Sequence, residues 1–128
     1  MLRRVDELTE QAAKRVIGAA IEVHRSLGPG YQEDVYERAL AVELNLRAIS
    51  FQRQVVFDVI YKGEPVGQGR LDFLVGGCLI VELKAVESLI PVFVGQVVSY
   101  LRATGNSLGL LINFNVPALT DGLKRVIL

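Results

Sequence analysis

The chain is poor in residues that carry covalent catalysis or bind metals through nitrogen and sulfur. Its 128 residues include one histidine, His24, and one cysteine, Cys78. A single cysteine excludes an intramolecular disulfide and is typical of a reducing compartment. Nothing favours a Cys–His pair, and a structural zinc site would lack its ligands. No serine lies in a nucleophile elbow, and the glycines form neither a P-loop nor a dinucleotide fingerprint.

The sequence also lacks net charge and long apolar runs. It contains 14 Lys and Arg against 14 Asp and Glu, so any binding to nucleic acid must depend on a local basic patch or on bound cations. No run is long enough to cross a bilayer, and residues 1–7 lack the apolar region of a signal peptide. We therefore expect a soluble, cytoplasmic protein with one domain at residues 1–128. Because 51% of its residues are hydrophobic, a homodimer that covers apolar surface remains open.

The most informative stretch is residues 69–84, which contains two short apolar runs joined by Gly76-Gly77. This pattern predicts a strand–turn–strand hairpin. Because side chains alternate along a strand, Glu82 and Lys84 should share one face, and the hairpin should bring Asp72 close to Glu82. Such groups at the end of a buried hairpin are costly unless they are paired or hold a metal. The simpler alternative is a solvated ion pair beyond the buried part of the hairpin.

Hydrophobic spacing and turn residues indicate the other elements of the chain. We expect helices at residues 9–27, 32–47 and 92–103, and strands at residues 51–61, 66–75, 78–84 and 108–114. The first three strands should form an antiparallel meander, and the fourth, which follows a helix, should have a parallel neighbour. Residues 123–128 could add a last strand or pack on a partner. In the first strand, one face should carry Phe51, Val55, Phe57, Val59 and Tyr61.

Several polar side chains lie on the predicted helices. His24 lies on an apolar face, where a structural role is more common than a catalytic one. Glu33 lies near the inward stripe at the start of the second helix, where it either favours the helix dipole or adds a carboxylate to a site. Gln96 and Tyr100 share a stripe of the third helix and are either a surface pair or site residues.

The carboxylate pattern resembles a known family signature. Asp72, a gap of nine residues and then Glu82-Leu83-Lys84 resemble the PD-(D/E)XK nuclease signature, and residues 30–36, Gly-Tyr-Gln-Glu-Asp-Val-Tyr, are similar to the motif that names the GxxExxY family within that superfamily. The resemblance continues through residues 36–40, 70–72, 81–86, 96–101 and 111–114. It implies an α/β (α+β) fold with a restriction-endonuclease-like αβββαβ core, a mixed central sheet flanked by helices, and one extra helix in front.

The resemblance further implies a Mg²⁺- or Mn²⁺-dependent nuclease that hydrolyses phosphodiester bonds in nucleic acid, with DNA as the favoured substrate. Hard oxygen ligands suit these ions. The implied metal ligands are the side chains of Glu33, Asp72 and Glu82 and the carbonyl of Leu83. The implied catalytic residues are Asp72, Glu82, Lys84 and Gln96, and the implied supporting residues are Tyr36, Arg70 and Tyr100.

The sequence departs from the family pattern at the third helix. Family members usually carry a histidine and a glutamate shortly before the glutamine of this helix, whereas this chain has Phe93 and Val94. The alternative function is therefore a catalytically weak or inactive nuclease-fold module that binds nucleic acid or protein. Net neutrality and small size favour this alternative, and the presence of Asp72, Glu82 and Lys84 argues against it.

Overall fold

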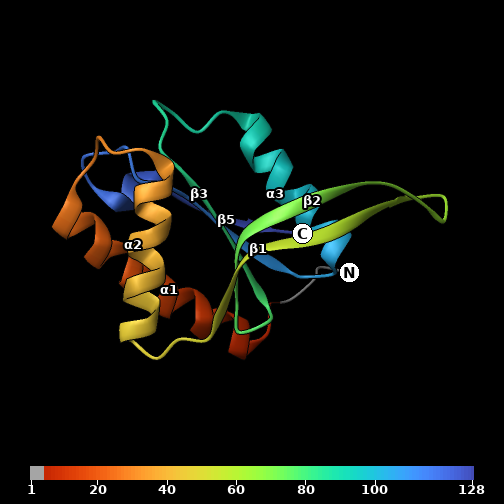
Figure 1. Ribbon diagram of the computed structural model, residues 1–128, viewed down its shortest axis with the longest axis horizontal. Helices are drawn as coiled ribbons and strands as arrows, with labels where there is room; N and C mark the ends of the chain where they lie inside the picture. Colours follow the sequence, from red (N-terminus) through yellow and green to blue (C-terminus); the bar gives the residue numbers. More distant parts are fainter. Residues whose placement is uncertain (1–4) are drawn as a thin grey trace.

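The computed structural model describes residues 5–128, so part of the stretch used to exclude a signal peptide, residues 1–4, lies outside it. The elements, shown in Figure 1, are α1 (Glu7–Leu27), α2 (Glu33–Leu46), β1 (Phe51–Tyr61), β2 (Glu64–Val75), β3 (Leu79–Lys84), α3 (Pro91–Thr104), β4 (Leu108–Asn113), the short 3-10 helix η1 (Leu119–Gly122) and β5 (Leu123–Ile127). The sequence predicted α1, α2, α3 and the first four strands with small differences at the ends, left a strand at β5 as one of two alternatives, and did not predict η1.

The five strands form one mixed sheet in the order β1-β2-β3-β4-β5. Neighbouring strands are antiparallel except β3 and β4, which run parallel with Leu79 opposite Leu108 and Lys84 opposite Asn113. Helix α3 makes the crossover between them, as the sequence predicted. The tail of the chain adds β5, which pairs with β4. The mixed α+β fold with a central sheet is therefore confirmed.

Helices cover both faces of the sheet, with α1 and α2 on one side and α3 on the other (Figure 1). Alternate residues of β3 divide between the two sides, because Leu79, Val81 and Leu83 join the apolar cluster beneath α1 and α2. Ile80 packs with Val97 and other residues of α3. In the part of the chain that the structure describes, none of the helices is both long and apolar enough to span a membrane.

Helix α1 has well-defined ends that the sequence explains. The Asp6 side chain caps its first turn by accepting a hydrogen bond from the Thr9 amide at 2.8 Å. Gly28 ends it with a left-handed φ of 69°, which glycine adopts without steric cost. Near this end the buried His24 ring is 2.8 Å from the Val116 carbonyl through Nε2. This contact ties α1 to the loop after β4 and supports the structural interpretation of His24.

Strand β1 does not keep one apolar face along its length, so the prediction that Phe51 shares a face with Val55 and Phe57 was wrong. Phe51 packs with the cluster beneath α1 and α2, whereas Val55 and Phe57 pack toward α3. Between them, Gln54 has a left-handed φ of 53°. This conformation interrupts the alternation of side chains, and the strand thereby changes the face that it presents to each helix layer.

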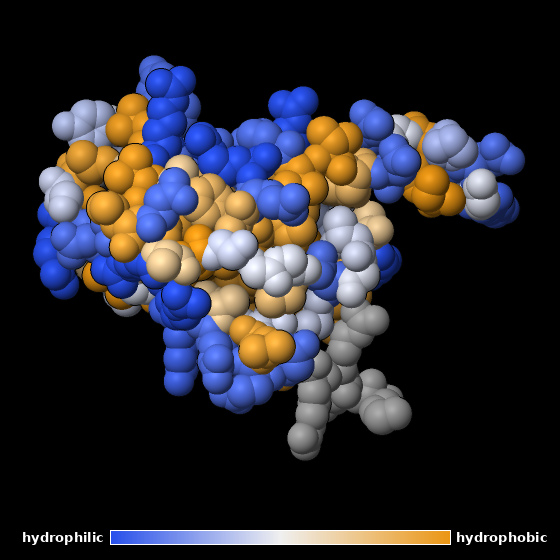
Figure 2. All heavy atoms as spheres, turned by 60° about the horizontal axis from the view of Figure 1, so that its bottom comes forward, coloured by the Kyte–Doolittle hydropathy of each residue, from blue (hydrophilic) through white to orange (hydrophobic). Residues whose placement is uncertain are grey.

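The outer parts of β1 and β2 form a two-stranded ribbon that projects from the body (Figure 1). It projects because β2 pairs with β3 only through Phe73, Leu74 and Val75. The Phe57 ring lies over Gly69, where a side chain on residue 69 would clash with it. Figure 2 shows apolar side chains mixed with hydrophilic ones along the ribbon. Its exposed large apolar residues are Val56, Val59, Ile60, Tyr61 and Val66.

Candidate active site

The end of the β2–β3 ladder brings Asp72 and Glu82 together. Backbone pairing stops at Phe73 and Val81, and in the next position the side chains replace the ladder. The Asp72 amide donates a hydrogen bond to Glu82 Oε2 at 2.7 Å, and the Leu83 amide donates one to Asp72 Oδ2 at 2.8 Å. The predicted proximity of Asp72 and Glu82 is therefore confirmed, and both carboxyl groups are fixed by the backbone of the opposite strand.

These two carboxyl groups are electrostatically strained without a cation. The side chain of Glu82 is buried, and this burial, followed by the nearby Asp72 carboxylate, raises the pKa of Glu82 to about 8. Burial also raises the pKa of Asp72, although the hydrogen bond from the Leu83 amide opposes the rise. Within the described residues, neither group forms an ion pair. A cation at this position would therefore relieve an existing electrostatic cost.

The backbone holds one oxygen of each carboxyl group, because Asp72 Oδ2 and Glu82 Oε2 are the atoms that accept the two amide hydrogen bonds. The two carboxyl groups also contact each other, and a hydrogen bond between them lowers the pKa of Asp72 and raises the pKa of Glu82. Asp72 Oδ1 and Glu82 Oε1 accept no backbone hydrogen bond within residues 5–128, so the backbone leaves these two oxygens for an ion.

Lys84 ends β3 on the same face as Glu82, as alternation predicted. Its Nζ lies 4.7 Å from the centroid of the Phe93 ring, which comes from the first turn of α3. Burial raises the pKa values of Asp72, Glu82 and Glu33, and the positive charge of Lys84 opposes each of these rises. Lys84 therefore lies within electrostatic range of all three carboxyl groups. Within the described residues, Lys84 therefore places a positive charge at the site without forming a salt bridge.

Glu33 begins α2 and lies at the edge of this group. Its side chain is largely exposed, but partial desolvation of the carboxyl group, followed by repulsion from Asp72, raises its pKa. Over residues 5–128, no three side chains of His, Cys, Asp or Glu are grouped closely enough to hold a metal ion. The structure thus brings Asp72 and Glu82 together and does not add Glu33 to them as a third ligand.

Tyr36 lies in the apolar cluster beneath α1 and α2. It is fully buried, and its ring stacks on Phe114 with centroids 4.6 Å apart. Its hydroxyl group donates a hydrogen bond to the Gly28 carbonyl at 2.6 Å and accepts one from the Tyr31 amide at 3.2 Å. Tyr36 therefore fixes the loop that leads into α2 and so the position of Glu33.

Sequence reasoning did not include Glu37 in the site. Its carboxylate accepts hydrogen bonds from Arg53 at 2.8 Å and from Gln54 at 2.7 Å, and its negative charge contributes to the raised pKa of Asp72. It therefore joins α2 to the point where β1 changes face. The available signal was its position four residues after Glu33, which places both on the same helical stripe.

Helix α3 presents Gln96 and Tyr100 beside the strands. The exposed Gln96 amide donates to the Tyr100 hydroxyl at 2.9 Å. Burial, followed by the charges of Glu82 and Asp72, raises the pKa of Tyr100, so this residue lies near both carboxyl groups. Tyr100 also contacts Phe57 edge-on, with centroids 5.1 Å apart. The exposed Arg70 lines a pocket of about 480 Å³ with Tyr100, Val56, Gln68 and Gly69.

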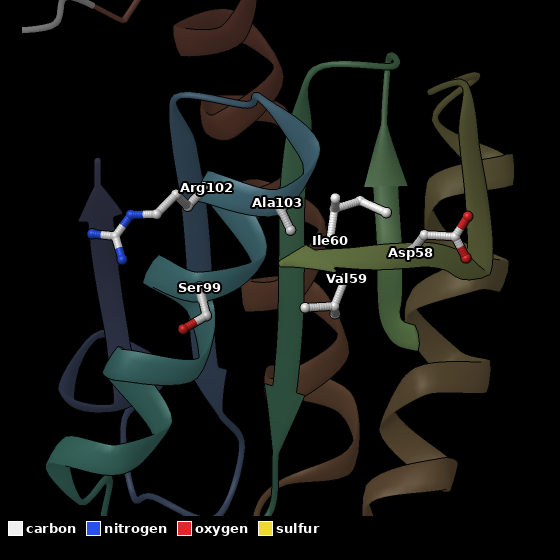
Figure 3. A pocket seen from close by; sticks show the side chains of 6 residues that line it. All are labelled: Asp58, Val59, Ile60, Ser99, Arg102 and Ala103. Atoms are coloured by element: carbon white, nitrogen blue, oxygen red, sulfur yellow. The ribbon is translucent and has the colours of Figure 1, made fainter. Parts of the chain in front are cut away.

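A separate pocket of about 340 Å³ lies between the ribbon and α3. Figure 3 shows its lining residues Asp58, Val59, Ile60, Ser99, Arg102 and Ala103. Arg102 points away from Asp58 in this view, so the pocket has no converging charged groups. Neither Asp72 nor Glu82 lines this pocket, so it is separate from the carboxyl pair.

Comparison with known families agrees with this arrangement. A family model described as the PD-(D/E)XK nuclease superfamily matches residues 10–126. The chain therefore belongs to the PD-(D/E)XK nuclease superfamily, whose nucleases act on nucleic acid and generally use divalent metal ions. No curated protein and no solved structure matches the chain.

Proposed function

We propose that this protein is a metal-dependent nuclease of the GxxExxY branch that hydrolyses phosphodiester bonds, with DNA as its substrate. The observation that carries the proposal is the pair Asp72 and Glu82, whose pKa values are raised, each with one oxygen that accepts no backbone hydrogen bond in the described residues and with Lys84 nearby. Burying carboxyl groups without a cation is energetically costly. Membership of a nuclease superfamily supports the proposal that the pair is retained in order to bind a metal ion.

The donor set fits a hard divalent ion. Asp72 Oδ1 and Glu82 Oε1 would hold Mg²⁺ or Mn²⁺, with the Leu83 carbonyl as a further proposed ligand, while Glu33 would remain at the edge of the site. When bound, the ion would supply Lewis acidity toward the phosphoryl group. The backbone hydrogen bonds to Asp72 and Glu82 keep both carboxyl groups oriented before the ion arrives, which lowers the cost of organising the site.

The remaining residues of the site would act on the substrate. The Lys84 ammonium group would stabilise negative charge that develops on the phosphate, since no carboxylate in the described structure pairs with it. Gln96 would help to position the attacking water. A role for the motif at residues 30–36 is supported by the Tyr36 hydroxyl group, which reaches from α2 to the preceding loop and forms hydrogen bonds with Gly28 and Tyr31.

A cleavage assay on the purified full chain tests the proposal. DNA and RNA substrates are incubated with Mg²⁺ or Mn²⁺, with EDTA as the metal-free control. We expect metal-dependent cleavage by the wild type and none by Asp72→Ala, whereas Asp121→Ala, which removes an exposed carboxylate from η1, should cleave normally. Cleavage by Asp72→Ala would contradict the assignment. Binding of nucleic acid without cleavage by the wild type would instead favour a non-catalytic module.

A further inference from the structure

We propose that Phe93 is a positioning residue that holds the Lys84 ammonium group in place through a cation–π contact. The catalytic consequence of this contact rests on the proposed nuclease function, but the contact itself does not. Phe93 lies in the first turn of α3, directly beside the end of β3, and its ring lies beneath the Lys84 ammonium group.

Lys84 needs such a support because its ammonium group has neither an ion pair nor a hydrogen bond within the described residues. It is the last residue of β3, and four flexible bonds separate its ammonium group from the backbone. Within residues 5–128, its Nζ takes part in no ion pair and no side-chain hydrogen bond. The ring of Phe93 is 4.7 Å away at its centroid, inside the range of about 6 Å in which a ring face attracts a cation.

Phe93 is itself held in position by the start of α3. Pro91 stands at the beginning of that helix, and the Phe93 amide donates a hydrogen bond to the Ile90 carbonyl at 3.0 Å. The half-buried ring packs against the apolar cluster that includes Ile80 and Val97. The ring is therefore a fixed surface, whereas the lysine that lies over it is a flexible side chain.

An aromatic ring holds an ammonium group without using its hydrogen-bond donors. A carboxylate at the same place would also attract Lys84, but it would neutralise the charge and occupy one or more of its three N–H groups. The face of Phe93 leaves all three donors free for the oxygens of a phosphate. The contact with Phe93 therefore keeps Lys84 both charged and available.

The contact is tested first by NMR, independently of activity. The chain contains four lysines, at positions 14, 62, 84 and 124, and a sample labelled in lysine is assigned with Lys84→Arg. The ring should shift the Lys84 side-chain methylene protons upfield, and Phe93→Leu should remove this shift while Phe93→Tyr keeps it. Lys62, which lies 5.4 Å from the Tyr61 ring, is the internal reference and should not change. An unchanged Lys84 shift in Phe93→Leu overturns the proposal.

Kinetics then test the positioning role. We expect Phe93→Leu to lower kcat by about 5- to 30-fold with little change in KM, and Phe93→Tyr to restore most of the rate. Phe51→Leu, which removes another half-buried ring that contacts Phe73, should lower stability without this loss of kcat. In a Lys84→Ala background, Phe93→Leu should have almost no further effect on kcat.

Two kinetic results would overturn the role. An equal loss of kcat in the presence and absence of Lys84 would show that Phe93 acts only by packing α3. A rise in KM at constant kcat would show that the ring binds substrate rather than the lysine. If the wild type cleaves nothing, the proposed nuclease function fails, and the NMR comparison alone decides whether Phe93 holds Lys84.

Discussion

Strand β3 faces α1 and α2 with Leu79, Val81 and Leu83, and it faces α3 with Ile80, Glu82 and Lys84. The first set is fully buried and entirely apolar, and each such side chain contributes about 1.5–3 kcal/mol of stability by burial. The second set includes a carboxyl group whose pKa is raised to about 8. One face of the strand therefore stabilises the fold. The free energy of burial on that face offsets the cost of keeping carboxyl groups on the other face that are unfavourable without a ligand.

The strongest test of this contrast removes both carboxyl groups from the face of β3 that carries Glu82. We expect the double variant Asp72→Asn, Glu82→Gln to lose measurable cleavage and calorimetric binding of Mn²⁺. Without metal, its melting temperature should equal or exceed that of the wild type, because repulsion and desolvation of the carboxyl groups are removed while amide oxygens can still accept the backbone hydrogen bonds. Equal Mn²⁺ binding by the variant, or a lower melting temperature in EDTA, would contradict this account.

The next largest effect is expected at Lys84. Lys84→Ala should lower kcat by about 10²–10³-fold, the scale seen when one preorganised donor to the transition state is removed. Its Mn²⁺ affinity and melting temperature should remain close to those of the wild type, since the lysine has no ion-pair partner in the described part of the chain. A structural lysine would instead change stability and metal binding together, so all three quantities should be measured on one sample.

A substitution on the apolar face should show the reverse pattern. Leu83→Ala is expected to lower the free energy of unfolding by about 2–5 kcal/mol, because Leu83 is fully buried in the cluster beneath α1 and α2. The backbone amide that binds Asp72 is retained, so the folded variant should keep a kcat within a few-fold of the wild type well below its melting temperature. Urea denaturation measures the first quantity, and a loss smaller than about 1 kcal/mol would show that this face is less important than its burial indicates.

The last of these tests concerns the pH dependence of stability. Because the pKa of Glu82 is raised from 4.5 to about 8 in the folded protein, the folded state binds this proton more tightly than the unfolded state. Its contribution to stability is complete below about pH 4.5 and is lost as the pH rises through about 8. In EDTA, the melting temperature should therefore fall over this range relative to that of Glu82→Gln. A constant difference between the two proteins would exclude the raised pKa.

Much of the fold and part of the site could be predicted from local sequence patterns. The Gly76-Gly77 turn sets the register of the β2–β3 hairpin, so alternation alone placed Asp72 beside Glu82 and Lys84 on the same face as Glu82. Helical spacing likewise placed Gln96 and Tyr100 on one stripe. These relations involve only residues within one hairpin or one helix, so local sequence patterns are enough to predict them.

Other features depend on packing and have no local signal. The left-handed conformation of Gln54 moves Phe51 to a different layer from Val55, and a glutamine gives no warning of it. The contacts of Glu37 with β1 and of Phe93 with Lys84 depend on how α2 and α3 lie across the sheet. Spacing within one helix predicts its stripe, but not the partner that the stripe meets.

The projecting ribbon of β1 and β2 has a consequence for the time scales on which the protein opens. Two strands alone are only marginally stable in water. The part of β2 that precedes Phe73 pairs with β1 but not with β3. The packing of Phe57 over Gly69 and against Tyr100 anchors its inner part. The ribbon should therefore open locally without unfolding the body. Backbone amides between Tyr61 and Gly67 should exchange with deuterium long before those of β3 and β4, while the carboxyl pair stays in place.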